Sequence, residues 1–222
     1  MRFDIMTLFP ELVNNVLSES IIGRARQAGI IEINAHNIRD YSKDKHRRVD
    51  DTPYGGGMGM LMAAPPVYDC YCDIPKCESC RTVYMSPKGK PLTQKKVKEL
   101  SGYDQIVILC GHYEGVDQRV LDLIIDEEIS IGDYVLTGGE IPACIVVDAV
   151  SRLKEGVLSD SECFENESLS EGMLEYPQYT RPYEFMGEKV PMVLLGGNHK
   201  EIDKWRFKKA LEMTKKQRPD LL

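Results

Sequence analysis

The sequence predicts an α/β fold in which helices cover both faces of a parallel β-sheet. Short apolar segments alternate with amphipathic ones over most of the chain. One apolar segment, Ile106–Cys110, contains no polar residue, as is typical of a strand buried on both faces. Residues that cap helices, such as Thr93 and Asp117, follow the apolar segments closely. This alternation is typical of parallel strands joined by crossover helices.

Each expected element follows from its apolar pattern and its flanking residues. The expected strands are Arg2–Leu8, Ile30–Ala35, Thr82–Met85, Ile106–Cys110 and Glu128–Ser130. One expected helix begins at Pro10. The others extend over Met60–Tyr71, Thr93–Leu100, Asp117–Ile125 and Glu140–Leu153. Proline is tolerated in a first helical turn because its missing N–H has no partner there. Three segments lack periodicity and are expected to be a loop (Lys43–Gly59), a turn (Ser86–Gly89) and a second loop (Ile131–Gly139).

The last part of the chain has a different pattern. Glu155–Arg181 is polar, acidic and aperiodic, which indicates a linker. Asn198 is the expected N-cap of a basic helix over His199–Thr214. We therefore expect a main α/β domain, a flexible linker and a small C-terminal helical domain. Their boundaries are placed at residues 1–158, 159–172 and 173–222.

The charge is distributed unevenly. The chain has 222 residues and a net charge of −7, which by itself argues against a nucleic-acid partner. However, Leu121–Glu175 holds 14 acidic residues and two basic ones, whereas the segment from His199 onward holds eight basic and four acidic ones. Basic surfaces that could bind RNA are therefore compatible with the acidic mean. No apolar run approaches the length of a membrane span and the start resembles no signal peptide, so we expect a cytoplasmic protein.

Four of the seven cysteines lie close together in the sequence. An odd number without a secretory context argues against disulfides. Cys70, Cys72, Cys77 and Cys80 could in principle bind zinc through four thiolates. Structural zinc sites usually have two closely spaced pairs separated by a longer connection, which this spacing lacks. We therefore expect no zinc and favour a cysteine-rich surface segment after a helix.

Three segments share one design and predict a ligand pocket. Tyr84–Pro87, Gly111–Gly115 and Ile131–Gly139 each follow an expected strand and are rich in small residues. In open α/β sheets, ligands bind beyond the carboxyl ends of the strands. Nine irregular residues at Ile131–Gly139 are also more than a connection needs. Side by side, the three segments would offer backbone groups and apolar walls to a purine.

The glycine-rich segment Tyr54–Gly59 is weaker as a nucleotide motif. A dinucleotide site needs a strand directly before the glycines and a helix after them, and Arg47–Pro53 is not a strand pattern. No P-loop signature is present in the sequence. The basic residues that precede the glycines favour a loop that contacts phosphates. They are Lys43, Lys45, His46, Arg47 and Arg48.

Motifs spread over nearly the whole chain resemble one enzyme family. They lie in Leu8–Glu11, Val49–Met60, Cys110–Asp117, Ser130–Glu140, Ser151–Arg152, Tyr179–Pro182 and Leu194–His199. In this order, they are similar to bacterial tRNA (guanine-N1)-methyltransferases of the SPOUT class. The resemblance implies a parallel sheet with a deep trefoil knot and an obligate homodimer with active sites between the subunits. It also implies methyl transfer from S-adenosylmethionine to N1 of guanosine 37, next to the tRNA anticodon.

The resemblance also assigns residues to the cofactor site. The implied residues are Tyr84, Met85, Ser86, Gly111, Tyr113, Glu114, Ser130, Ile131, Gly132, Asp133, Tyr134, Val135, Leu136, Gly138 and Gly139, with Glu175 lent by the partner subunit. They include most of the three segments identified above. For tRNA, the expected contacts are Asp50, Arg47, Arg48, Lys208 and Lys209.

Two residues are expected to act on the guanine. N1 carries a proton and becomes nucleophilic once a carboxylate removes it. Charge then develops on O6, where a guanidinium stabilises it. The resemblance assigns these roles to Glu167, where relatives have aspartate, and to Arg152; Glu165 remains an alternative base. Two other functions stay open: a SPOUT methyltransferase acting at another RNA position, and a non-catalytic RNA-binding module.

Overall fold

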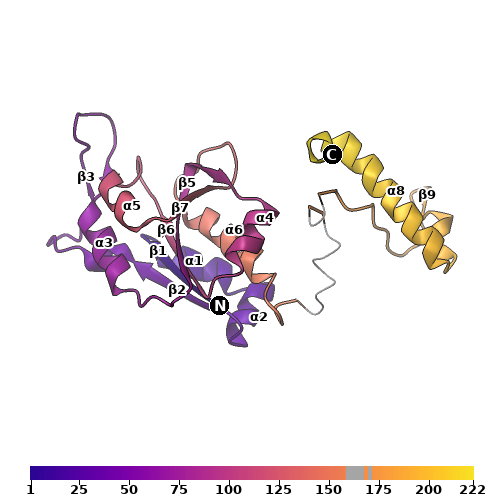
Figure 1. Ribbon diagram of the computed structural model, residues 1–222, viewed down its shortest axis with the longest axis horizontal. Helices are drawn as coiled ribbons and strands as arrows, with labels where there is room; N and C mark the ends of the chain where they lie inside the picture. Colours follow the sequence, from indigo (N-terminus) through magenta and orange to yellow (C-terminus); the bar gives the residue numbers. More distant parts are fainter. Residues whose placement is uncertain (159–167, 170–171) are drawn as a thin grey trace. The chain divides into compact units, whose positions relative to one another are not determined.

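The computed structural model describes residues 1–158, 168–169 and 172–222 (Figure 1). The chain divides into two compact units, Met1–Ser159 and Asp160–Leu222. Glu165 and Glu167, the alternatives for the predicted base, lie outside the described residues. None of the described helices is long and apolar enough to cross a membrane.

Five strands form one parallel sheet in the first unit (Figure 1). They are β1 (Arg2–Thr7), β2 (Glu32–Asn37), β5 (Cys80–Pro91), β6 (Gln105–Cys110) and β7 (Glu127–Ser130). Their order is β2-β1-β6-β5-β7, and each neighbouring pair is parallel. The middle strand, β6, is buried at every residue, as its apolar sequence predicts. The predicted α/β fold with a parallel sheet is thus confirmed.

Helices cover both faces of this sheet. The helices of the first unit are α1 (Pro10–Leu17), α2 (Ser20–Gln27), α3 (Ala64–Asp73), α4 (Gln94–Leu100), α5 (Gln118–Ile124) and α6 (Glu140–Ser151). Alternate residues of β6 belong to two separate cores, because successive side chains of a strand point to opposite faces. Ile106 and Ile108 pack with α1, α2, α4 and α6, whereas Val107 and Leu109 pack with α3 and α5.

The predicted capping residues begin their helices as expected. Thr93 accepts a hydrogen bond from the backbone N–H of Lys96 at 3.3 Å and starts α4. Asp117 accepts one from the N–H of Arg119 at 2.9 Å and starts α5. Each cap satisfies a donor that the first helical turn leaves unpaired.

One predicted turn is wrong. Ser86–Gly89 is expected to end the strand that begins near Thr82, but β5 continues through it to Pro91. The continuation pairs with β7 after a shift of register between Met85 and Lys90. Proline and glycine indicate a turn when local sequence alone is considered, yet both are compatible with an irregular strand beside a bulge.

The segment before α3 also differs from its prediction. The expected helix Met60–Tyr71 begins four residues later, at Ala64, because Leu61–Met62 forms the short strand β4. The antiparallel partner of β4 is β3 (Asp50–Asp51), which lies inside the expected loop. Before this loop, the 3-10 helix η1 covers Ile38–Tyr41. Such a short ladder depends on a distant pairing that local periodicity does not report.

The second unit is built around one long helix, α8 (His199–Gln217). Its other elements are β8 (Glu184–Phe185), β9 (Glu188–Lys189), η2 (Met192–Leu195) and η3 (Pro219–Leu221). The Asn198 side chain accepts a hydrogen bond from the N–H of Glu201 at 3.4 Å, which confirms the predicted cap. Within the predicted linker, the described residues 172–181 form neither helix nor strand.

Candidate functional site

The three small-residue segments line a single cavity of about 300 Å³. It lies beyond the ends of β6 and β7 and beside the middle of β5, whose residues Tyr84–Lys88 line it. Ligands of open α/β sheets bind beyond the carboxyl ends of the strands. The predicted cofactor residues that line it are Tyr84, Met85, Ser86, Gly111, Tyr113, Glu114, Ser130, Ile131, Gly132, Tyr134, Val135, Leu136, Gly138 and Gly139. Asp133 is not part of the lining, and Glu175 belongs to the second unit. The predicted convergence of the three segments on one pocket is confirmed.

Backbone contacts hold the second and third segments together. The N–H of Gly139 donates to the carbonyl oxygen of Gly111 at 2.9 Å. His112 and Gly138 form an isolated antiparallel bridge. The Ser130 hydroxyl donates to the carbonyl of Gly132 at 3.0 Å, which holds the start of the third segment. Two walls of the cavity are therefore fixed to each other through main-chain groups.

Close packing explains two of the glycines in this lining. A Cβ atom at Gly111 would lie 2.7 Å from the hydroxyl oxygen of Tyr84, and one at Gly139 would lie 2.7 Å from the Cα atom of Cys110. Real Cβ atoms do not approach other heavy atoms this closely. A side chain at either position would therefore displace a wall of the cavity.

Tyr84 forms part of the cavity floor and is only 7% exposed. Burial, and then the negative charge of Glu128, raise the pKa of Tyr84 to about 12. Its hydroxyl therefore keeps its proton at neutral pH and is a hydrogen-bond donor. Glu128 also lines the cavity and was absent from the predicted site. Its pairing with Tyr84 across β5 and β7 is visible only in the structure, so no local sequence signal identifies it.

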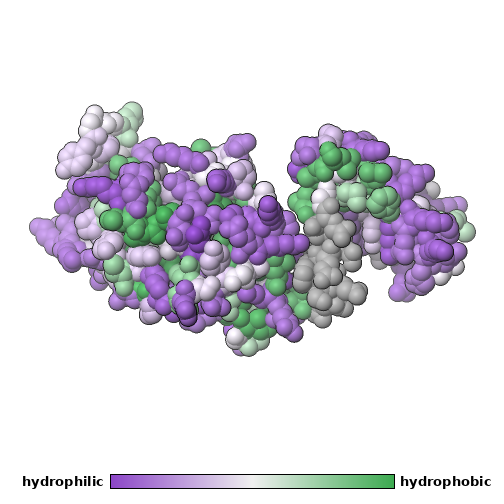
Figure 2. Space-filling model, viewed as in Figure 1, coloured by the Kyte–Doolittle hydropathy of each residue, from purple (hydrophilic) through white to green (hydrophobic). Residues whose placement is uncertain are grey.

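The loop between β3 and β4 is joined to the cavity lining. The N–H of Glu114 donates to the carbonyl of Met60 at 3.0 Å, and a Cβ atom at Gly59 would lie 2.4 Å from Cγ of Glu114. The loop projects from the unit, and its tip is white to pale green in Figure 2. Tyr54 and Met58 in this loop are 99% and 95% exposed. A glycine-rich loop with exposed side chains thus adjoins the cavity.

Arg152 is placed differently from the cavity residues. It is the C-cap residue of α6, and its N–H donates to the carbonyl of Asp148 at 3.1 Å. It lines a second cavity, of about 560 Å³, with residues of α1, α2 and α6 such as Val16, Ile22 and Ile145. Arg152 is thus absent from the lining of the first cavity.

The predicted tRNA contacts lie on exposed surfaces. Arg47 forms an ion pair with Asp40 at 3.1 Å, and Arg48 forms one with Asp44 at 3.3 Å. Asp50 lies in β3 and is partly buried. Exposed ion pairs of this kind contribute little to stability, so both arginines can exchange partners at small cost.

Two further predicted tRNA contacts and Glu175 lie in the second unit. Lys208 and Lys209 are on α8, where Lys209 pairs with Glu212 at 2.7 Å. The N–H of Glu175 donates to the Ser168 hydroxyl oxygen at 2.9 Å. Its carboxylate accepts a hydrogen bond from the Gln178 side chain.

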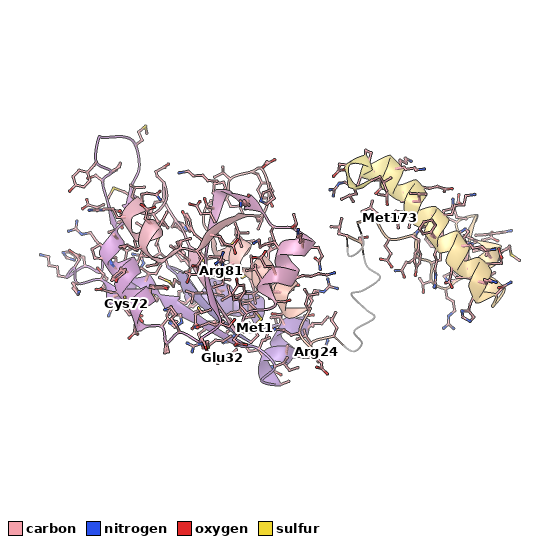
Figure 3. All side chains as sticks on the ribbon, in the orientation of Figure 1. Met1, Arg24, Glu32, Cys72, Arg81 and Met173 are labelled. Carbon is pink, nitrogen blue, oxygen red and sulfur yellow. The ribbon has the colours of Figure 1, made fainter. Side chains whose placement is uncertain are left out.

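The clustered cysteines lie in α3 and at the start of β5. Cys70 is fully buried, and burial raises the pKa of its thiol to about 12. Cys72 and Cys77 are exposed, and Figure 3 labels Cys72 at the end of α3. Within the part of the chain that the structure describes, His, Cys, Asp and Glu form no group of three or more that could hold a metal ion.

Comparison with known proteins gives one consistent result over the whole chain. The family model described as tRNA (Guanine-1)-methyltransferase TrmD matches residues 1–222. A tRNA (guanine-N(1)-)-methyltransferase of Ruminiclostridium cellulolyticum is 57% identical over 100% of this chain and 96% of its own length. Proteins of the same name from Lachnospira eligens and Clostridioides difficile are 55% and 54% identical over 100% of this chain and 94% and 97% of theirs. The chain therefore belongs to the tRNA (guanine-N1)-methyltransferase family.

Proposed function

We propose that this protein transfers the methyl group of S-adenosylmethionine to N1 of guanosine 37 in tRNA, producing N1-methylguanosine. The observation that carries the proposal is the cavity where Tyr84–Pro87 of β5 meets the segments after β6 and β7. Its position is the one at which open α/β sheets bind nucleotides. The family membership supplies the reaction class. The proposed location is the cytoplasm, because the substrate is tRNA.

The residues present fit an adenosyl ligand. Gly111 and Gly139 let backbone approach the cavity closely, since a Cβ atom at either would meet a neighbour at 2.7 Å. Apolar side chains such as Ile131 and Leu136 line the same space and suit a purine ring. The remaining predicted cofactor residues, including Asp133, would complete the site. When bound, S-adenosylmethionine supplies a methyl group activated by its sulfonium charge.

The catalytic proposal concerns one carboxylate and one arginine that act on the guanine. We assign proton removal from guanine N1 to Glu167, with Glu165 as the alternative, and stabilisation of O6 to Arg152. The assignment of Glu167 and Glu165 rests on the family pattern. The C-cap position of Arg152 on α6 supports this role, because the helix backbone gives the side chain a defined point of attachment. Glu175 would be lent by the partner subunit.

We propose that the active protein is a homodimer with active sites between subunits. Arg152 lines a groove that is separate from the cavity of its own chain, which supports a site completed by a second copy. Three apolar side chains of α1 and α6 that line this groove are exposed: Val16 (48%), Ile141 (46%) and Ile145 (40%). Leu12 on α1 is also exposed (39%). A second copy that covered them would remove this apolar surface from water.

The trefoil knot remains part of the proposal. Its support is the contact between the segments after β6 and β7, where Gly139 bonds to Gly111 and His112 bridges Gly138. These contacts hold the two segments against each other at the cavity. We further propose that the second unit is a tRNA-binding domain. Arg47, Arg48 and Asp50 would act with Lys208 and Lys209 in binding tRNA.

A methyl-transfer assay tests the function. The full chain is incubated with radiolabelled S-adenosylmethionine and two tRNA transcripts that carry G or A at position 37. We expect label on the G37 transcript only, and nuclease digestion with mass analysis should identify N1-methylguanosine. Equal labelling of both transcripts would place the reaction at another position. No transfer with retained RNA binding would favour the non-catalytic module.

A further inference from the structure

One cavity-lining residue has a buried carboxylate oxygen without a hydrogen-bond partner in the described part of the chain. Glu128 lines the cavity, and its Oε2 atom is buried without a hydrogen-bond partner among the described residues. Buried polar atoms in native proteins nearly always have one, and exceptions call for a specific explanation, a ligand among them. Neither the predicted site nor the catalytic proposal uses Glu128.

Glu127, the neighbouring acid on the same strand, has ion-pair partners for its carboxylate. Glu127 pairs with Arg81 at 3.2 Å and with Lys96 at 2.9 Å. Figure 3 labels Arg81, which belongs to β5. Successive side chains of a strand point to opposite faces, so Glu127 and Glu128 have different surroundings. Only Glu128 of these two lines the cavity.

Tyr84 is paired with Glu128 across the β5–β7 ladder. Paired residues of adjacent strands present their side chains on the same face. The protonated Tyr84 hydroxyl lies against Gly111, 2.7 Å from the position that a Cβ atom there would occupy. Because Gly111 lies in the cavity wall, the floor combines a hydrogen-bond acceptor, the Glu128 carboxylate, with a donor, the Tyr84 hydroxyl.

We propose that Glu128 and Tyr84 bind the ribose of the adenosyl ligand, with the Glu128 carboxylate accepting a hydrogen bond from one hydroxyl and Tyr84 donating to the other. The inference rests on the proposed function and names a subsite within it. A ribose hydroxyl both donates and accepts, so a vicinal diol matches a neighbouring acceptor and donor. An ammonium or amino group only donates hydrogen bonds, so it could not accept one from the Tyr84 hydroxyl. Acidic residues bind ribose hydroxyls in the same way in dinucleotide sites.

Calorimetric binding of S-adenosylhomocysteine, which carries no transferable methyl group, tests the assignment on the full chain. We expect Glu128→Ala to weaken binding about tenfold or more, because a charge-assisted hydrogen bond is lost. Glu128→Gln keeps the shape of the side chain and should give a smaller loss, which guards against a folding defect. Glu127→Gln, the matched control on the same strand, should bind as wild type does.

Two analogues separate the ribose from the amino-acid arm. The 2′-deoxy and 3′-deoxy analogues of S-adenosylhomocysteine should each bind the wild type more weakly than S-adenosylhomocysteine does. The analogue that lacks the hydroxyl held by Glu128 should bind Glu128→Ala and the wild type with equal affinity. Methylthioadenosine, which lacks the amino-acid arm, should remain sensitive to Glu128→Ala. The inference would be overturned, with the proposed function left standing, if Glu128→Ala bound methylthioadenosine as tightly as the wild type does. The same holds if both deoxy analogues lost equal affinity in both proteins. If wild type fails to bind S-adenosylhomocysteine, the proposed function falls, and this inference with it.

Discussion

The Thr7 hydroxyl donates a hydrogen bond to Oε1 of Glu140 over 2.8 Å, and both side chains are buried. The bond joins the end of β1 to the first turn of α6, where the helix dipole favours a carboxylate. Thr7 Oγ1 also accepts a hydrogen bond from the N–H of Phe9 at 2.9 Å. Because α6 directly follows the cavity segment Ile131–Gly139, this buried pair fixes the far end of that segment.

Replacing Thr7 by valine should destabilise the protein by about 1–3 kcal/mol, because the buried carboxylate of Glu140 would lose its hydroxyl donor. Urea unfolding measures the change. Thr7→Ser keeps the hydroxyl and should remain much closer to wild type. A valine variant as stable as wild type would show that water or another group satisfies Glu140 equally well.

Gly111→Ala should weaken S-adenosylhomocysteine binding about tenfold or more, a cost of about 1.4 kcal/mol or more. The added Cβ atom would lie 2.7 Å from the Tyr84 hydroxyl, so the Tyr84 side chain or the Gly111 backbone would have to move in the cavity lining. Gly196→Ala is the control, since its Cβ atom would meet only one atom, at 3.9 Å. Calorimetry gives both affinities. Unchanged binding by Gly111→Ala would mean that the ligand does not need this wall.

A buried acid in β1, an interior strand of the sheet, sets a pH dependence of stability. The Asp4 carboxylate is fully buried and lies 2.8 Å from Arg2 Nε and from His36 Nε2, and 2.6 Å from Gln105 Nε2. Burial alone would raise the pKa of Asp4, but these hydrogen bonds outweigh it and lower the pKa. Ionised Asp4 therefore stabilises the folded state above its unfolded pKa. This contribution is lost as the pH falls through the folded pKa.

Asp4→Asn should lower the free energy of unfolding near neutral pH and flatten its decline below about pH 4. Urea unfolding from about pH 7 to about pH 3 measures both effects. Asp220→Asn removes an exposed partner of Arg218 and should leave the acid slope almost unchanged. An unaltered slope in Asp4→Asn would assign the acid sensitivity to other groups.

Arg152→Ala and Glu167→Gln should each reduce methyl transfer by about a hundredfold or more, because each removes a group proposed to act on guanine. S-adenosylhomocysteine binding should remain largely intact in both variants. Single-turnover assays with tRNA measure the chemical step. If Glu167→Gln keeps full activity, Glu165→Gln is the next variant, and its loss of activity would reassign the base.

Local sequence predicted the elements whose cause is local. The apolar run of β6 and the caps Thr93, Asp117 and Asn198 are each visible in a few residues, and the structure confirms them. The continuation of β5 through Pro87 was missed because it depends on pairing with β7, far away in the sequence. Short-range patterns carry no information about that partner.

The candidate site likewise has features that local sequence predicts and features that only the structure reveals. The three small-residue segments could be predicted to converge because parallel strands end at one edge of a sheet. Glu128 could not be identified, since only the structure reveals that Oε2 of one of two adjacent acids lacks a described partner. The position of Arg152 outside the cavity lining was equally invisible in the sequence.

The separation of Arg152 from its own cavity leads to a complementation experiment. Arg152→Ala keeps an intact cavity, whereas Gly111→Ala keeps an intact Arg152. The assay uses S-adenosylmethionine well below the dissociation constant of Gly111→Ala, so that the binding defect of this variant limits its activity. If Arg152 acts on the cavity of the partner subunit, a mixed dimer has one complete site. Random exchange of the two variants should then restore about a quarter of wild-type activity, because half of the dimers are mixed and each has one of two sites intact. If one chain supplies both groups, every site carries a defect, and the mixture should be as inactive as the separate variants.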